Sequence, residues 1–197
     1  MSDANTSMMS LDELHEYLAG KASPLDINKI IAGYEMSEEA FKDAVFIDGT
    51  PFFYHLTRVA RIILTELEIY DADIIVAALL HDYSIISNYI SKEILTFNFG
   101  AYLTYLVDLL SLDTEEAAYI SENFSYEAKI PFDDYLAIKL AEEVDVFRNG
   151  IHNVELNLVS RLCLLNEKLL PLARRSSSKS VNYLIDELTN LKNKITN

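Results

Sequence analysis

The chain has 197 residues, of which half are hydrophobic, and its formal net charge is −15 at pH 7. This length suits a single domain with a sizeable core, and the acidity opposes broad contact with nucleic acid or an anionic membrane surface, because both reward clustered lysine and arginine. No segment approaches the roughly 18 uninterrupted apolar residues of a membrane-spanning helix, so we expect neither nucleic acid nor a membrane as a partner.

A single cysteine and an acidic N-terminus predict a cytoplasmic protein. Cys163 lies in the apolar run LVSRLCLLNEKLL, which excludes an intramolecular disulfide and favours core packing in a reducing compartment. The first residues, MSDANTSMMS, contain no basic segment followed by an apolar block, so they predict neither a signal peptide nor a transit peptide.

The N-terminal part of the chain predicts a polar tail followed by short helices. Ser10 is a candidate N-cap for the first helix, and Pro24 opens the second. The predicted helices are Leu11 to Leu18, Pro24 to Ala32, and a third that starts at Ser37 and carries Ala40, Phe41, Ala44 and Val45 on one side. We assign residues 1–36 to an N-terminal tail with helices and residues 37–197 to the main part of one globular domain.

A turn and two strongly apolar helices form the middle of the chain. The segment Asp48-Gly49-Thr50-Pro51 is a strong turn signal, and it leads into an amphipathic helix that begins near Phe52. The next helix can be capped by Asp71 or Asp73, and its residues from Ile74 to Leu80 are apolar on all sides. A helix that is apolar all round is buried, so we expect this one at the centre of the fold.

The rest of the chain also predicts helices. They run from about Ser91 to Phe97, Ala101 to Leu110, Thr114 to Asn123, Asp133 to Phe147, Val154 to Leu169 and Ser180 to Ile195. No stretch shows the alternation of a β-strand, and there is no internal repeat. The predicted fold class is all-α.

Two of the four histidines stand at the edges of the apolar helices. His55 lies near the start of the helix that follows the turn, and His81 closes the fully apolar helix together with Asp82, whereas His15 and His152 have polar neighbours. Burying an ionised aspartate beside a histidine costs several kcal/mol unless a cation compensates its charge. Two imidazoles and a carboxylate suit Mn, Fe or Zn, so these residues predict a divalent-metal site.

Six segments in a fixed order resemble one known family. They are GTPFFYHLTRVARI from Gly49, AALLHD from Ala77, the Phe-Gly pair at Phe99 with LVDLLS after it, AIKLAEEVDVFRN from Ala137, LLPLARR from Leu169 and DELTNL from Asp186. Over residues 42–191 the chain is similar to the hydrolase domain of the RelA/SpoT family, an HD-domain helical bundle. That domain removes the 3′-pyrophosphate from guanosine alarmones and also occurs alone as small alarmone hydrolases.

The resemblance implies a metal centre and a phosphorylated substrate. In that family four residues hold a divalent metal, usually manganese, and they correspond here to His55, His81, Asp82 and Glu142. Glu142 replaces an aspartate, and Asp145, one helical turn further on, is a second candidate for the fourth ligand. The cations left near the expected pocket are Arg58, Lys139 and Arg148, which are candidate substrate contacts. The implied partner is a guanosine nucleotide or another phosphorylated small molecule.

The chain departs from the family where protons are moved and phosphate is bound. The Glu-Asp pair that usually follows the His-Asp doublet corresponds to Ile85 and Ile86, and neither can move a proton. The basic pair before the turn corresponds to Ala44 and Val45, and the asparagine after the fourth ligand corresponds to Val146. General acid–base catalysis is typically worth ~100- to 10,000-fold, so an enzyme with these changes would be slow.

Each candidate residue also has a purely structural interpretation. His55 could be a helix-end histidine bonded to a backbone carbonyl, and Glu142 could belong to a solvated acidic helix face. Single cations on helices often pair with neighbouring acids. The tyrosines near the expected pocket, Tyr54, Tyr83 and Tyr89, could stack on a base or belong to the core.

Three functions therefore stay open. The first is a metal-dependent phosphohydrolase with altered or reduced activity. The second is a catalytically inactive HD-domain protein that binds a nucleotide or a protein partner, and the third is a helical interaction module without a metal. The first is preferred because three intact ligands and a carboxylate at the fourth position favour a use for an ion.

Overall fold

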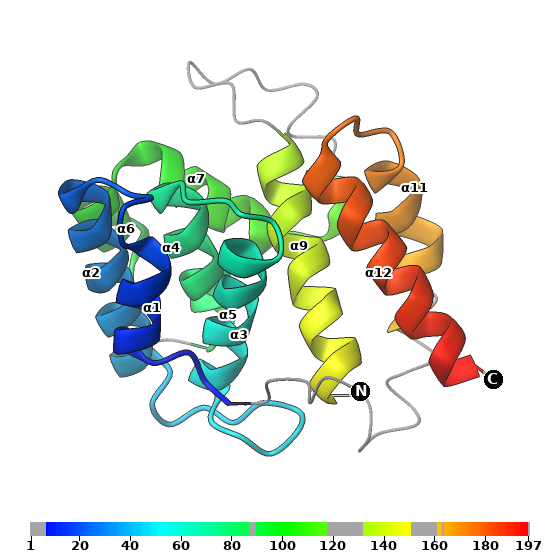
Figure 1. The fold of residues 1–197 in the computed structure, drawn as a ribbon, viewed down its shortest axis with the longest axis horizontal. Coiled ribbons are helices and arrows are strands. Elements are labelled where there is room, and N and C mark those ends of the chain that lie inside the picture. The colour runs from blue at the N-terminus through cyan, green and yellow to red at the C-terminus, as the bar shows by residue number, and fades with distance from the viewer. Residues whose placement is uncertain (1–6, 87–89, 118–131, 151–160, 163, 197) are drawn as a thin grey trace.

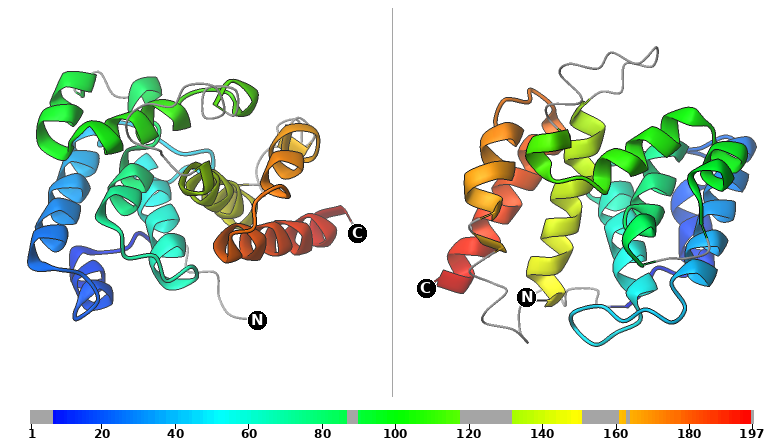
Figure 2. Two further views of the ribbon diagram at one scale, coloured as in Figure 1. Left: turned by 90° about the horizontal axis from the view of Figure 1, so that it is seen from above. Right: turned by 180° about the vertical axis from the view of Figure 1, so that it is seen from behind.

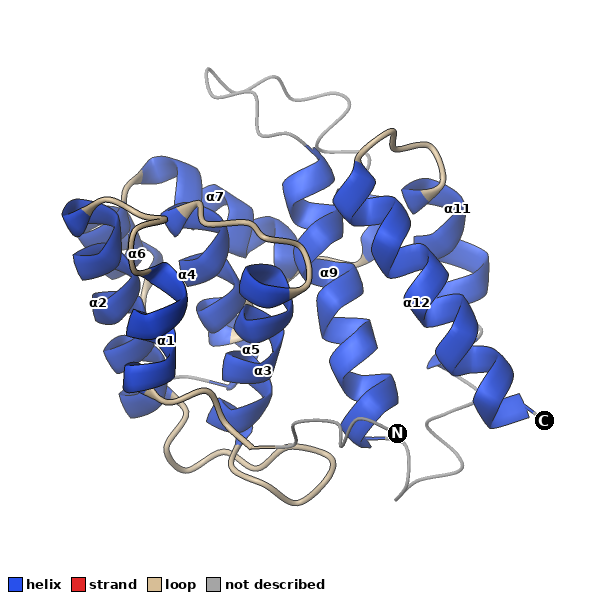
Figure 3. Cartoon of the chain, viewed as in Figure 1, coloured by secondary structure: helices blue, strands red, loops and turns tan. Residues whose placement is uncertain are grey.

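The computed structural model of the chain consists of helices and connecting loops (Figure 1, Figure 3). It describes residues 7–86, 90–117, 132–150, 161–162 and 164–196. Within these residues there is no β-strand, and Val45 and Pro51 form an isolated bridge. The predicted all-α class is confirmed.

The described helices follow one another along the chain in this order. The α-helices are α1 (Leu11–Leu18), α2 (Pro24–Ala40), α3 (Phe52–Thr65), α4 (Ala72–Leu80), α5 (Tyr83–Ile86), α6 (Lys92–Phe99), α7 (Ala101–Leu110), α9 (Phe132–Asp145), α11 (Leu170–Ala173) and α12 (Lys179–Thr196). Two wider, π-helical turns are η1 (Val146–Gly150), which continues α9, and η3 (Leu165–Leu169), which leads into α11.

Helix α4 lies at the centre of the fold, as its apolar sequence predicts. Residues 74–80 are all buried, and α2, α3 and α7 each contact this helix. Helix α9 packs against α3 and α4 on one side and against α12 on the other, so it joins the N-terminal group of helices to the C-terminal one (Figure 1, Figure 2). This arrangement brings the start of α3 close to the end of α4 and to the C-terminal end of α9.

The two helices predicted around Gly33 are a single helix, α2, so that prediction was wrong. Gly33 continues the helix, and its lack of a side chain lets α2 approach α4 closely. A Cβ atom at this position would lie 2.7 Å from Cγ1 of Val76. Ser37, predicted to start a new helix, is buried in α2 and donates a 2.7 Å hydrogen bond to the Leu79 carbonyl. Because α2 ends at Ala40, Ala44 lies in a loop and not on a helix.

The predicted turn before α3 is confirmed. Oδ1 of Asp48 accepts hydrogen bonds from the backbone nitrogen of Thr50 at 2.8 Å and from its hydroxyl at 2.6 Å. Gly49 has φ +86°, a conformation that suits glycine. At the start of α4, Asp71 accepts hydrogen bonds from the next turn, as predicted for its N-cap.

The later helices agree with the prediction in kind and differ at their ends. α7 has the predicted bounds, α6 extends to Phe99, and α9 gives way to η1 after Asp145. Parts of the helices predicted at Thr114 to Asn123 and Val154 to Leu169 lie outside the described residues, as do Tyr89, His152 and Cys163. The division at residue 36 stays a prediction, and that residue lies inside α2. No helix among the described residues is long and apolar enough to span a membrane.

Candidate metal centre

Three of the predicted ligands come together at the ends of two helices. His55 projects from the first turn of α3, and His81 and Asp82 directly follow α4. One ligand atom from each of the three lies within 4.8 Å of the others. The two imidazole rings are 5.3 Å apart between centroids and are steeply inclined to each other, by 75°. The three side chains are therefore close enough to face one ion.

The imidazole of His81 is oriented by a backbone carbonyl. Its Nδ1 atom lies 2.8 Å from the carbonyl oxygen of Ala78. A carbonyl can only accept, so Nδ1 carries a proton, and in the neutral ring the lone pair is on Nε2. Nε2 is fully buried and has no hydrogen-bond partner among the described residues, and its distance to Oδ2 of Asp82 is 3.6 Å. Buried polar atoms are rarely left unsatisfied, so this nitrogen points to a ligand.

The imidazole of His55 is oriented by a carboxylate from α9. Its Nδ1 atom lies 2.7 Å from Oδ2 of Asp145, and both side chains are almost completely buried. Burial lowers the pKa of His55 against the opposing effect of Asp145, so the ring is neutral. Nδ1 donates its proton to the carboxylate, and Nε2 is left to bind a metal. Carboxylates commonly orient metal-binding histidines in this way.

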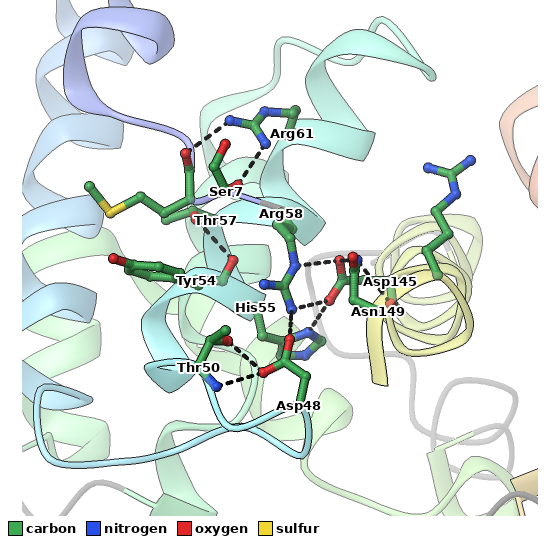
Figure 4. A network of polar contacts seen from close by, with 12 residues as sticks. Ser7, Asp48, Thr50, Tyr54, His55, Thr57, Arg58, Arg61, Asp145 and Asn149 are labelled. Atoms are coloured by element: carbon green, nitrogen blue, oxygen red, sulfur yellow. Dashed lines mark hydrogen bonds and ion pairs between the residues drawn. The ribbon is translucent and has the colours of Figure 1, made fainter. Parts of the chain in front are cut away.

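Asp145 is itself held by groups on two sides (Figure 4). Arg58 donates from Nε to Oδ1 at 2.8 Å and from Nη2 to Oδ2 at 3.1 Å, and Asn149 donates from Nδ2 to Oδ1 at 2.8 Å. Burial alone would raise the pKa of Asp145, but these bonds and the one from His55 lower it, so the carboxylate is ionised. Arg58 also reaches Asp48 at 3.3 Å, which ties the turn before α3 to this network.

An aromatic side chain covers one face of His55. Phe46, from the loop between α2 and α3, stacks on the imidazole with a centroid distance of 4.1 Å and an interplanar angle of 9°. The guanidinium carbon of Arg58 lies 5.5 Å from the centroid of the Phe46 ring. Stacking on Phe46 and bonding to Asp145 together fix the plane and the rotation of the His55 ring.

Glu142 lies between two cations. Lys139 donates to its Oε2 at 2.7 Å and Arg161 to its Oε1 at 3.2 Å, and Arg161 also donates to Glu143 at 2.8 Å. Burial alone would raise the pKa of Glu142, but the positive charges around it, that of Lys139 foremost, hold it well below its usual range. Burial alone would lower the pKa of Lys139 and of Arg161. Nearby carboxylates, Asp82 among them, outweigh this effect and raise both pKa values. Lys139, Glu142 and Glu143 lie on the same helix as Asp145, the partner of His55.

The other predicted site residues have different surroundings. Arg58 is 3% exposed and stands behind His55, in contact with acids of the protein. Arg148 donates to Glu66 at 2.6 and 3.0 Å and to Glu187 at 2.8 Å. Glu66 caps the C-terminal end of α3, whereas His55 is in its first turn. Tyr83 is buried and donates a hydrogen bond to Asp108, and Tyr54 is half-buried against the core. Ile85 and Ile86 belong to α5.

Sequence reasoning missed Arg161, Asn149 and Asp48 as parts of this region. A signal for Arg161 was present, because it is a single cation in an apolar run, where a charge needs a partner. Asn149 and Asp48 carried no such signal, since polar residues after a helix and in a turn are ordinary.

The residues present fit a divalent transition-metal ion. Two imidazoles and one carboxylate form the donor set, and one of the imidazole nitrogens is buried without a hydrogen-bond partner among the described residues. Asp145 supplies the outer hydrogen bond that metal-binding histidines usually have.

Comparison with known proteins gives a match in structure. No protein-family model matches the chain, and no curated protein matches it. A solved structure of a metazoan ortholog of SpoT, which hydrolyzes ppGpp and plays a role in starvation responses, is similar with a TM-score of 0.62 at 20% sequence identity. The match covers 83% of this chain and 95% of that one. The chain therefore has an all-α fold that resembles that of this SpoT ortholog.

Proposed function

We propose that the protein is a metal-dependent phosphohydrolase whose substrate is a phosphorylated small molecule of the guanosine-alarmone type. The observation that carries this proposal is the buried Nε2 atom of His81, which has no hydrogen-bond partner among the described residues and lies beside His55 and Asp82. The resemblance of the fold to that of a ppGpp hydrolase supports the choice of substrate class.

In this proposal His55, His81 and Asp82 hold the ion, and the mixture of imidazole and carboxylate donors suits Mn²⁺. When bound, a divalent ion supplies Lewis acidity that activates water and offsets the charge of phosphoryl oxygens. Asp145 keeps the proton of His55 on Nδ1 and so directs Nε2 to the ion. Arg58 acts through Asp145, because its guanidinium bonds to that carboxylate.

The cations best placed for the phosphates are Lys139 and Arg161. Both lie close enough to Asp82 for its charge to raise their pKa. Arg148 binds Glu66 at the C-terminal end of α3, whereas His55 is in the first turn of that helix, and we therefore give Arg148 a structural role in place of the substrate contact expected from the sequence.

A second function is favoured by the residues that follow the His-Asp doublet. Ile85 and Ile86 stand where the similar family has an acidic pair, and hydrocarbon side chains accept no proton. A protein with this change could bind a nucleotide or a protein partner without turning it over.

The test combines metal analysis with an activity assay. Purified protein is titrated with Mn²⁺ by calorimetry and assayed for pyrophosphate release from guanosine 3′,5′-bis(diphosphate). We expect one ion per chain and slow release, both lost in His81→Ala and both kept in His15→Ala, which removes an exposed histidine of α1. Metal and nucleotide binding without release would favour the second function. Absence of Mn²⁺ binding would refute the metal centre.

A further inference from the structure

We propose that Glu142 stands outside the metal's ligand set and serves as the internal counter-anion of Lys139 and Arg161, so that three protein residues alone hold the ion. This inference rests on the proposed function, because it concerns the same metal centre. It replaces the four-ligand arrangement expected from the sequence with His55, His81 and Asp82.

The first argument is that both oxygens of Glu142 already have partners. Oε2 accepts from Lys139 at 2.7 Å and Oε1 from Arg161 at 3.2 Å. Lys139 lies one helical turn before Glu142 on α9, and the extra methylene of a glutamate lets the carboxylate reach back to it. Among the described residues, the group with mutually close ligand atoms contains His55, His81 and Asp82 and does not include Glu142.

The second argument is that the other acid of this helix face is also occupied. Asp145 uses Oδ2 for His55 and Oδ1 for Arg58 and Asn149. α9 therefore contributes an orienting carboxylate and a counter-anion, and each of their four oxygens already accepts a hydrogen bond from the protein. Two histidines and one carboxylate leave several positions of an ion open, as in other metal centres whose substrates bind the ion directly.

The third argument is the balance of charge. The side chains of Lys139 and Arg161 are 18% and 30% exposed, and opposite charges stabilise charges that are partly removed from water. Glu142 contacts both of them, while Glu143 contacts only Arg161. Removing the charge of Glu142 leaves an excess of positive charge next to the metal centre, which weakens the binding of a cation and strengthens the binding of an anion.

Compensating substitutions separate a counter-anion from a ligand. Mn²⁺ affinity is measured by calorimetry for wild type, Glu142→Gln, Lys139→Met/Glu142→Gln and Asp82→Asn, with the exposed Glu16→Gln as control. We expect Glu142→Gln to weaken binding by about 10-fold through charge alone. The double variant should return to within about 3-fold of wild type, because one positive charge has been removed with the negative one. Asp82→Asn should lose at least about 100-fold.

An anion provides a readout that needs no metal. In the presence of a chelator, inorganic pyrophosphate should bind Glu142→Gln several-fold more tightly than wild type, and the double variant no more tightly than wild type. Circular dichroism confirms that each variant is folded. A double variant that binds Mn²⁺ as weakly as Asp82→Asn would make Glu142 a ligand and overturn this inference alone. Wild type that binds no Mn²⁺ would overturn the proposed function as well.

Discussion

Nδ1 of His55 and Oδ2 of Asp145 lie 2.7 Å apart although 90 residues separate them in sequence. We expect Asp145→Asn to weaken Mn²⁺ binding by about 10- to 100-fold, because an amide accepts the His55 proton poorly and lets the ring rotate. Calorimetric titration measures the change. Asp12→Asn, on the exposed side of α1, is the control. Wild-type affinity in Asp145→Asn would show that the hydrogen bond does not position the ring.

Restoring the acids after the His-Asp doublet should increase turnover. We expect Ile85→Glu/Ile86→Asp to release pyrophosphate from guanosine 3′,5′-bis(diphosphate) about 100-fold faster than wild type, the low end of what general acid–base catalysis supplies. Ile85→Gln/Ile86→Asn has similar size and polarity but accepts no proton, so it should not gain activity. Equal rates in the two double variants would mean that the missing acids do not limit the reaction.

The contact of Gly33 with Val76 should make the effect of a substitution at position 33 depend on residue 76. A Cβ at position 33 would lie 2.7 Å from Cγ1 of Val76, so we expect Gly33→Ala to lower the free energy of unfolding by about 1–3 kcal/mol. In a Val76→Ala background both Cγ atoms are gone and only Cβ, at 3.2 Å, remains, so the same change should cost at least about 1 kcal/mol less. Urea unfolding of the four proteins measures both effects. Equal effects in the two backgrounds would disprove the contact.

The pairing of Arg148 predicts a structural role. Its guanidinium joins η1 to Glu66 at the end of α3 and to Glu187 on α12. We expect Arg148→Met to lower the free energy of unfolding by about 1–3 kcal/mol and to leave KM unchanged. The exposed Arg174→Met should change neither quantity. A raised KM with unchanged stability would restore Arg148 as a substrate contact.

Two aspartates outside the metal centre should respond to pH with opposite signs. Burial raises the pKa of Asp134 above its ordinary value of 3.8, so its stabilising contribution is complete below that value and is lost as pH rises through the folded-state pKa. Hydrogen bonds from the backbone of Glu116 and Glu115 lower the pKa of Asp113, so its contribution is present above 3.8 and is lost on acidification.

The corresponding asparagine variants test these signs. Asp134→Asn should gain stability relative to wild type as pH rises from about 4 to 7, and Asp113→Asn should gain it as pH falls below about 4. Urea unfolding at several pH values gives both slopes. Parallel curves for wild type and Asp134→Asn would contradict the effect of burial on that carboxyl.

The parts of the fold that sequence predicts are those decided by local chemistry. The turn at Asp48 and the caps of α1 and α4 depend on side chains that bond within a few residues, and the burial of α4 follows from its composition. The continuity of α2 could not be predicted, because Gly33 resembles a helix breaker until Val76 lies against it.

The same difference applies to the candidate site. His55, His81 and Asp82 stand at predictable helix ends, so their meeting could be expected from the order of the helices. The partners of Glu142 could not, because Arg161 approaches α9 from a later segment and only its arrival decides where the carboxylate points.

The unequal burial of the three proposed ligands sets how an ion would exchange with solvent. The side chains of His55 and His81 are 1% and 0% exposed, whereas that of Asp82 is 16% exposed. An ion would therefore enter and leave past Asp82, and its residence time would depend on how readily this carboxylate dissociates from it.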